Sequence, residues 1–154
     1  MIDMRKFFLP PLIGIMSLFL AIPAQGDEVP YFDWTAQGLA IPEPLGGLRG
    51  DPERGKTVVV DRERGSCLTC HHMPIPEEPM HGTIGPPLTG VASRLTEAEL
   101  RLRVVDEKLL NPHTIMPSFY RHPSKLNRPH PGFMTTVLTA QEVEDVVAYL
   151  VTLK

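Results

Sequence analysis

Apolar residues near the C-terminal end of the chain recur at helical spacing. They fall at positions i, i+3, i+4, i+7 and i+8, which places them on one helix face: Val143, Val146, Val147, Leu150 and Val151. Thr139 precedes this run and is followed three residues later by Glu142, which is the spacing of a capping box. The pattern predicts a last helix that begins after Thr139 and buries its apolar face.

The same signals predict a helix in the middle of the chain. Thr96 and Glu99 form a second capping box. The helix should extend over residues 97–109, and Pro112 should end it because proline disfavours helical geometry at the residue before it. Its expected buried positions are Leu102, Val105 and Leu109.

A first helix is expected from Asp51 to about Glu63. Asp51 is a good N-cap, and Pro52 occupies the first helical position, where its missing N–H costs nothing. Gly55 weakens this helix, so we expect it to serve the close approach of another helix, with Tyr149 lying across it. No strand pattern accompanies these elements. The chain is therefore predicted to be all-α, with three to four helices over residues 51–154.

Residues 27–50 are predicted to form an irregular N-terminal arm. Three prolines and a Gly-Gly pair deny this segment a regular element. It nevertheless carries Tyr31, Phe32 and Trp34, the last being the only tryptophan of the chain. Apolar aromatic side chains must pack on something, so the arm covers either the domain that follows it or a partner protein.

Residues 1–26 have the layout of an export signal. Two basic residues precede an apolar run over residues 7–20, and small residues flank the expected cleavage site after Gly26, with Ala24 as the second choice. A retained membrane anchor is the alternative. Cleavage would change the formal net charge from -3 to -4, because the segment carries two basic residues and one acidic residue. This mild acidity argues against nucleic acid or an anionic membrane as a partner.

The chemistry of the chain centres on Cys67, Cys70 and His71. The order Cys-Leu-Thr-Cys-His is the attachment motif of c-type haem. Each thiol can add to one vinyl group of the same porphyrin, and the adjacent imidazole can bind the iron as an axial ligand. The chain has 2 cysteines, which leaves none for a disulfide framework or a four-ligand zinc site. A redox-active Cys67–Cys70 disulfide and half of a metal site are the alternatives.

Two further predictions complete the iron site. In the proline-rich loop after the motif, the carbonyl of Pro86 is the candidate acceptor for the far nitrogen of the His71 ring. Met116, bracketed by prolines in an extended loop, is the candidate sixth ligand, with Met134 as the competitor and a histidine or an open site as further alternatives. A methionine ligand would raise the reduction potential and occupy the oxygen-binding position, which indicates electron transfer.

Together these residues resemble class I cytochromes c. The stretches GDPERGKTVVVDRERGSCLTCHHMPIPE, HGTIGPPLTGV, LNPHTIMPSFY and LTAQEVEDVVAYL are similar to the SoxX subfamily, over about residues 41–154. This resemblance implies one covalent haem c in a periplasmic subunit that carries electrons during thiosulfate oxidation. It also implies a SoxA-like haem cytochrome as partner, a SoxYZ-type carrier protein and a soluble cytochrome as electron acceptor.

The resemblance further implies that the reactive cysteine of such an L-cysteine S-thiosulfotransferase complex belongs to the SoxA-like partner. The residues agree with this, because haem attachment would consume both thiols of the present chain. Two other classes of function stay open. One is a free monohaem electron shuttle of another respiratory chain, and the other is a haem enzyme or sensor with a labile sixth ligand.

Overall fold

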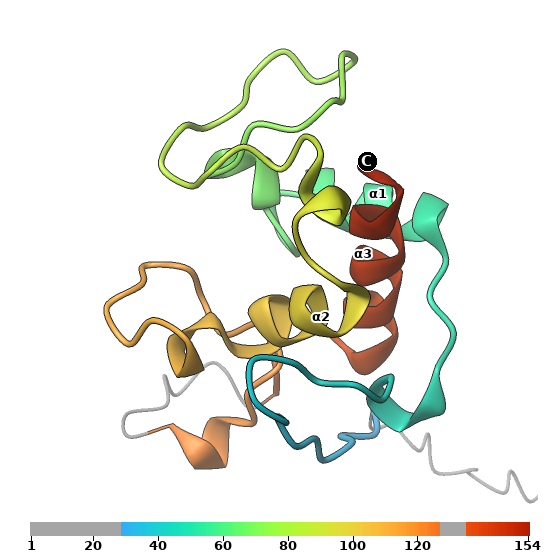
Figure 1. Ribbon diagram of the computed structural model, residues 1–154, viewed down its shortest axis with the longest axis vertical. Helices are drawn as coiled ribbons and strands as arrows, with labels where there is room; N and C mark the ends of the chain where they lie inside the picture. Colours follow the sequence, from blue (N-terminus) through green and yellow to red (C-terminus); the bar gives the residue numbers. More distant parts are fainter. Residues whose placement is uncertain (1–28, 127–134) are drawn as a thin grey trace, which may run out of the picture.

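Three α-helices form the frame of the computed structural model, which describes residues 29–126 and 135–154 (Figure 1). Helix α1 spans Pro52–Val60, α2 spans Glu97–Asp106 and α3 spans Ala140–Thr152. Within the described ranges, the other regular structure is five short 3-10 turns and one isolated β-bridge, so the all-α prediction is confirmed. None of the helices described is long and apolar enough to cross a membrane. The predicted export signal lies outside the described residues.

The capping signals of the sequence are all present. Asp51 accepts hydrogen bonds from the first turn of α1, and both capping boxes are formed, at Thr96 with Glu99 and at Thr139 with Glu142. The apolar face of α3 is buried as expected at Val143, Val146, Val147 and Leu150, whereas Val151 is partly exposed.

Helices α1 and α3 cross in direct contact, and Gly55 makes the crossing possible. A Cβ atom at Gly55 would stand 1.9 Å from the carbonyl oxygen of Asp145 and 2.9 Å from the Cβ of Tyr149. No side chain larger than hydrogen fits in that space. The close helix approach expected at Gly55, with Tyr149 across it, is confirmed.

The carboxylate of Asp145 joins the same two helices by hydrogen bonds. It accepts from the backbone N–H of Asp51 at 2.8 Å and from the guanidinium of Arg54 at 2.8 Å. Burial by itself raises the pKa of Asp145, but these hydrogen bonds and the charge of Arg54 outweigh burial and hold the pKa below its usual 3.8. The charged form is therefore the one that stabilises the crossing.

Two details of the helix prediction were wrong. Helix α1 ends at Val60, not near Glu63, because Asp61 starts a turn: its side chain accepts from the N–H of Glu63 and its carbonyl accepts from Ser66. The last turn of the middle helix, Glu107–Leu109, is a 3-10 turn. This tighter winding changes the direction of the last side chains, and Leu109 is 53% exposed although it was expected to be buried.

Residues 29–50 of the N-terminal arm pack on the helices. Ile41 and Leu45 are buried in the core, and the carbonyl of Ile41 accepts from the guanidinium of Arg101 at 3.0 Å. Arg101 also forms a buried ion pair with Glu144 at 2.9 Å, and Glu144 in turn accepts from the backbone N–H of Leu45 at 2.9 Å. One charge pair thus ties the arm, α2 and α3 together.

The aromatic residues of the arm contribute to the same packing. Tyr31 stacks on Tyr120 with ring centroids 5.0 Å apart, and the N–H of Phe32 donates to the Tyr120 hydroxyl at 2.7 Å. Tyr31, Phe32 and Trp34 are all partly buried against the core. Of the two alternatives for the arm, packing on its own domain is therefore the one that these contacts support.

Candidate haem site

The Cys-Leu-Thr-Cys-His motif is wound into a single 3-10 turn, Cys67–Thr69. Ser66 opens the turn in the left-handed conformation, with φ of 50°. The carbonyl of Cys67 accepts from the N–H of Cys70 at 3.1 Å and from that of His71 at 2.9 Å. These bonds bring the two thiols and the imidazole to one short bend, as attachment to a single porphyrin requires.

The loop that follows folds back along the motif. Backbone N–H groups of Gly82, Gly85 and Leu88 donate to carbonyls of the motif segment at 2.7, 2.8 and 2.9 Å. The acceptors are Leu68, Cys70 and His72 in the same order along the chain. Loop and motif therefore form one hydrogen-bonded unit, although the loop contains no regular secondary structure.

This unit fixes the ring of His71. The Nδ1 atom lies 2.7 Å from the carbonyl oxygen of Pro86. A carbonyl can only accept, so Nδ1 carries the proton and donates, and Nε2 keeps the lone pair that a metal ligand needs. The hydrogen bond expected from the sequence is thus present. Gly85 supports the ring from the side, because a Cβ there would stand 2.4 Å from the Cε1 atom of His71.

The two thiols are free and do not form a disulfide. Burial raises the pKa of the Cys67 thiol to about 12. A thiol with such a pKa is protonated at neutral pH, which is the opposite of the lowered pKa typical of a reactive redox dithiol. In the described part of the chain, no group of three or more His, Cys, Asp or Glu side chains is arranged to hold a metal ion.

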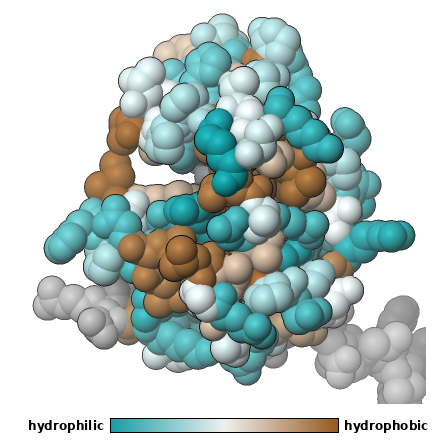
Figure 2. Space-filling view, in the orientation of Figure 1, coloured by the Kyte–Doolittle hydropathy of each residue, from teal (hydrophilic) through white to brown (hydrophobic). Residues whose placement is uncertain are grey.

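Met116 lies in the loop that follows α2. Its side chain is partly buried against the core, and its N–H donates to the Thr114 hydroxyl at 3.1 Å. The loop after α2 lies in the lower half of the view, and the motif and its loop lie in the upper half (Figure 1). Figure 2 shows a hollow between these two halves, bordered by hydrophobic residues. The competing Met134 lies outside the described residues. Met73 is in the core, and Met80 is 74% exposed.

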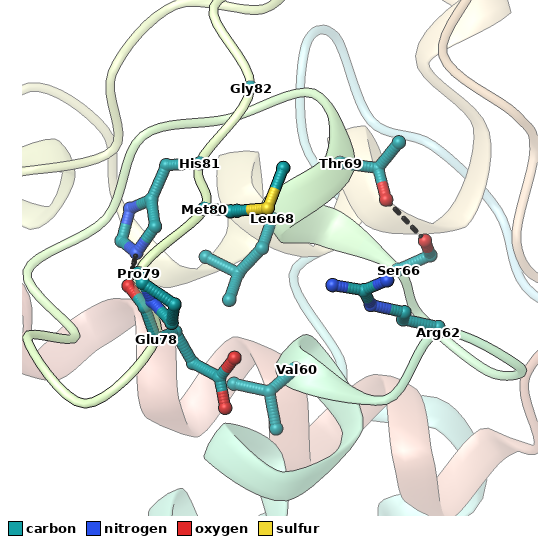
Figure 3. A pocket seen from close by; sticks show the side chains of 10 residues that line it. All are labelled: Val60, Arg62, Ser66, Leu68, Thr69, Glu78, Pro79, Met80, His81 and Gly82. Atoms are coloured by element: carbon teal, nitrogen blue, oxygen red, sulfur yellow. Dashed lines mark hydrogen bonds between the residues drawn. The ribbon is translucent and has the colours of Figure 1, made fainter.

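A separate pocket of about 540 Å³ lies beside the motif (Figure 3). Leu68 and Met80 stand in its middle, between the hydrogen-bonded pairs Ser66–Thr69 and His81–Glu78. Neither cysteine, His71 nor Met116 lines it, so it is not the space for a haem between the two expected ligands. His81 accepts at Nδ1 from the N–H of Met73 and uses its other nitrogen on Glu78, which makes it a loop clamp.

The donor set fits a c-type haem on the observations above. A bent pair of thiols is followed by an imidazole whose Nδ1 is already hydrogen-bonded, and the position beside its ring admits only glycine. The sequence predicted the hydrogen bond between His71 and the Pro86 carbonyl, which is present, but it did not predict the contact of Gly85 with the ring. The signal for it was present, since Gly85 immediately precedes the proline pair that faces the histidine.

Comparison with known proteins agrees with the site. The cytochrome c family model matches residues 52–154, and the chain therefore belongs to the cytochrome c family. A chain in the crystal structure of SoxXA from P. pantotrophus is 38% identical, with a TM-score of 0.73. The match covers 79% of the present chain and 94% of that chain. Among curated protein sequences, no relative matches significantly.

These matches confirm three of the expectations from the sequence. The fold is that of a class I cytochrome c, the subfamily is SoxX, and the cofactor is one covalently bound haem c.

Proposed function

We propose that this protein is the monohaem electron-transfer subunit of a SoxAX-type complex that oxidises thiosulfate in the periplasm. The observation that carries the proposal is the likeness to a SoxXA chain, at 38% identity over 94% of that chain. Likeness at this level extends far beyond the haem motif.

In this proposal Cys67 and Cys70 hold the haem through thioether bonds, and His71 binds the iron through Nε2. The haem supplies one-electron oxidation and reduction. The chain fixes the ligand ring through the Pro86 carbonyl, which also makes the imidazole a stronger electron donor. Met116 would supply the sixth ligand, and its thioether would favour the ferrous state and raise the reduction potential.

The proposed partners follow from what this chain lacks. With both thiols bound to haem, no thiolate of this chain remains for sulfur transfer. A SoxA-like haem cytochrome would therefore carry the reactive cysteine, and a SoxYZ-type carrier would present the cysteine that accepts thiosulfate. Thiosulfate coupling to a thiol releases two electrons, which this subunit would pass singly to a soluble cytochrome. Export by residues 1–26 would bring the chain to the periplasm, with a membrane attachment only if that segment is retained.

The function is tested with the haem-loaded protein and a SoxA-like partner. The two chains should elute together on size exclusion, and both should stain for haem on a denaturing gel. Addition of a SoxYZ-type carrier and thiosulfate should then reduce the haem of this chain only when the partner is present. A chain that stays monomeric and is not reduced under these conditions would support the free electron shuttle instead.

The sixth ligand is tested by comparing Met116→Ala with Met134→Ala. Loss of the Met116 thioether should lower the reduction potential and let carbon monoxide bind the reduced protein, whereas Met134→Ala should leave both properties unchanged. The reverse result would transfer the ligand role to Met134. Tight carbon monoxide binding by the wild-type protein would favour a haem enzyme or sensor.

A further inference from the structure

A buried carboxylate stands at the end of α2, just before the segment that carries Met116. Asp106, the last residue of the helix, is 1% exposed. Its Oδ1 accepts from the hydroxyl of Ser118, and its Oδ2 lies 3.5 Å from the guanidinium of Arg121. Burial of a carboxylate is unfavourable unless hydrogen bonds and charges compensate it. Both compensating groups come from the segment just after Met116.

The same loop is held on its other side. The ammonium of Lys108 donates to the carbonyl of Thr114 at 2.8 Å, and the Thr114 hydroxyl accepts from the N–H of Met116 at 3.1 Å. The Thr114 N–H donates to the carbonyl of Asn111 at 3.0 Å. Met116 thus lies between Thr114 and Ser118, and both are anchored to groups at or just beyond the C-terminal end of α2.

We propose that Asp106 is a positioning residue for Met116, which holds the loop so that the thioether stays within reach of the iron in both oxidation states. The inference rests on the proposed role of Met116 as sixth ligand. A thioether is a weak donor and binds ferric iron less well than ferrous iron. The ferric protein therefore depends most on a rigid loop, because a loop free to move would release the weaker bond first.

The two contacts of Asp106, with Ser118 and with Arg121, differ in strength. The carboxylate of Asp106 fixes the chain at Ser118, two residues after the methionine. Pro117, which lies between them, has no N–H and cannot donate a backbone hydrogen bond. Arg121 is about a third exposed, so its charge is compensated partly by water. Of the two contacts of Asp106, the bond from Ser118 is the one nearer to Met116 along the chain, and it is charge-assisted, the stronger kind of hydrogen bond.

The test uses the haem-loaded protein and three variants of this contact. Ser118→Ala removes the tether alone, Asp106→Ala removes the carboxylate, and Asp106→Asn keeps an oxygen that Ser118 can donate to. The ferric proteins are examined for the long-wavelength charge-transfer band of sulfur bound to iron. The reduced proteins are examined for the rate of carbon monoxide binding, and thermal unfolding is recorded for all.

We expect Ser118→Ala and Asp106→Ala to lose much of the ferric band and to bind carbon monoxide about tenfold faster, the effect of one charge-assisted hydrogen bond on loop opening. Asp106→Asn should restore both properties toward wild type. Glu144→Gln is the matched control, because it alters a buried carboxylate whose partners are Arg101 and Leu45. It should lower the unfolding temperature and leave the band intact.

Two results would overturn the inference, and they differ. If Met116→Ala opens the iron to carbon monoxide while Ser118→Ala and Asp106→Ala keep the band, the ligand assignment stands and the carboxylate only stabilises the fold. If Met116→Ala itself leaves the band and carbon monoxide exclusion unchanged, the sixth ligand is another residue and the positioning role is wrong with it.

Discussion

Replacement of Gly85 by alanine tests how strongly the loop controls the ring of His71, the proposed iron ligand. The added methyl carbon would stand 2.4 Å from Cε1, 2.6 Å from Nδ1 and 2.9 Å from Nε2 of that ring. The φ angle of Gly85 lies outside the left-handed region, so alanine adds no backbone strain there. The perturbation is a steric push on the imidazole.

The size of the effect follows from the contact distances. Carbon atoms in van der Waals contact stand about 3.5 Å apart, so the ring would have to move by about 1 Å. The hydrogen bond from Nδ1 to Pro86, now 2.7 Å, does not survive such a shift. Loss of an outer partner of a metal-bound histidine costs about 10- to 100-fold in metal affinity. Because the weakened imidazole donates less to ferric iron, the reduction potential should rise, by about 59 mV for each tenfold loss in the ferric state.

The assay is a redox titration of the haem-loaded Gly85→Ala protein, with its haem content measured on a denaturing gel. Gly47→Ala is the control: its φ of 67° makes alanine unfavourable, but a Cβ there meets no atom within 4 Å. The control should lose stability and keep its potential. A Gly85→Ala protein with the wild-type potential and full haem content would show that the contact with the ring does not govern the site.

Three other changes test the rest of the structure. Cys67→Ala with Cys70→Ala should abolish covalent haem on a denaturing gel and leave a largely unfolded chain by circular dichroism, because a core this small depends on the porphyrin. Glu144→Gln should cost about 3 kcal/mol in chemical denaturation, since it removes the buried partner of Arg101 and leaves only the exposed carboxylate of Glu97 beside that charge, whereas a paired Arg101→Met, Glu144→Met protein should recover most of it. Asp145→Asn should lower stability at neutral pH but flatten its loss in acid: the depressed pKa makes the wild-type contribution fully present above pH 3.8 and lost as pH falls below that value. If the stability of Asp145→Asn falls in acid as steeply as that of the wild type, the acid dependence comes from other carboxylates.

Local signals in the sequence were sufficient wherever the physical cause is local. Both capping boxes join residues three apart, and the apolar face of α3 repeats within a few turns, so each could be predicted without knowing what packs against it. The haem c cofactor could be predicted for the same reason, because its attachment motif lies within five residues, from Cys67 to His71. The close helix approach at Gly55 was also predicted correctly. A glycine inside a helix lowers the stability of that helix, so its presence indicated a reason outside the helix itself.

The errors occurred where local signals compete. No strong helix breaker stands between Val60 and Gly65, but Asp61 can use its side chain and carbonyl in a turn, and the turn is what forms. Leu109 falls on the apolar side of an ideal α-helix, and it is exposed because the final turn winds more tightly. The hydrophobic pattern of the sequence is the same whether these two turns form or not, so the pattern could not predict them.

The tertiary structure alone decided which distant groups meet. Arg101 and Glu144 are 43 residues apart and stand among apolar positions of two helices, so nothing in either helix predicts that the charges pair. The partners of Asp106 follow it by twelve and fifteen residues, across a loop without periodicity. Buried charges need partners of opposite charge or hydrogen bonds, but the requirement does not say which residue supplies them. That choice is made when helices and loops pack, and in this protein the choice places a buried carboxylate beside the loop of Met116.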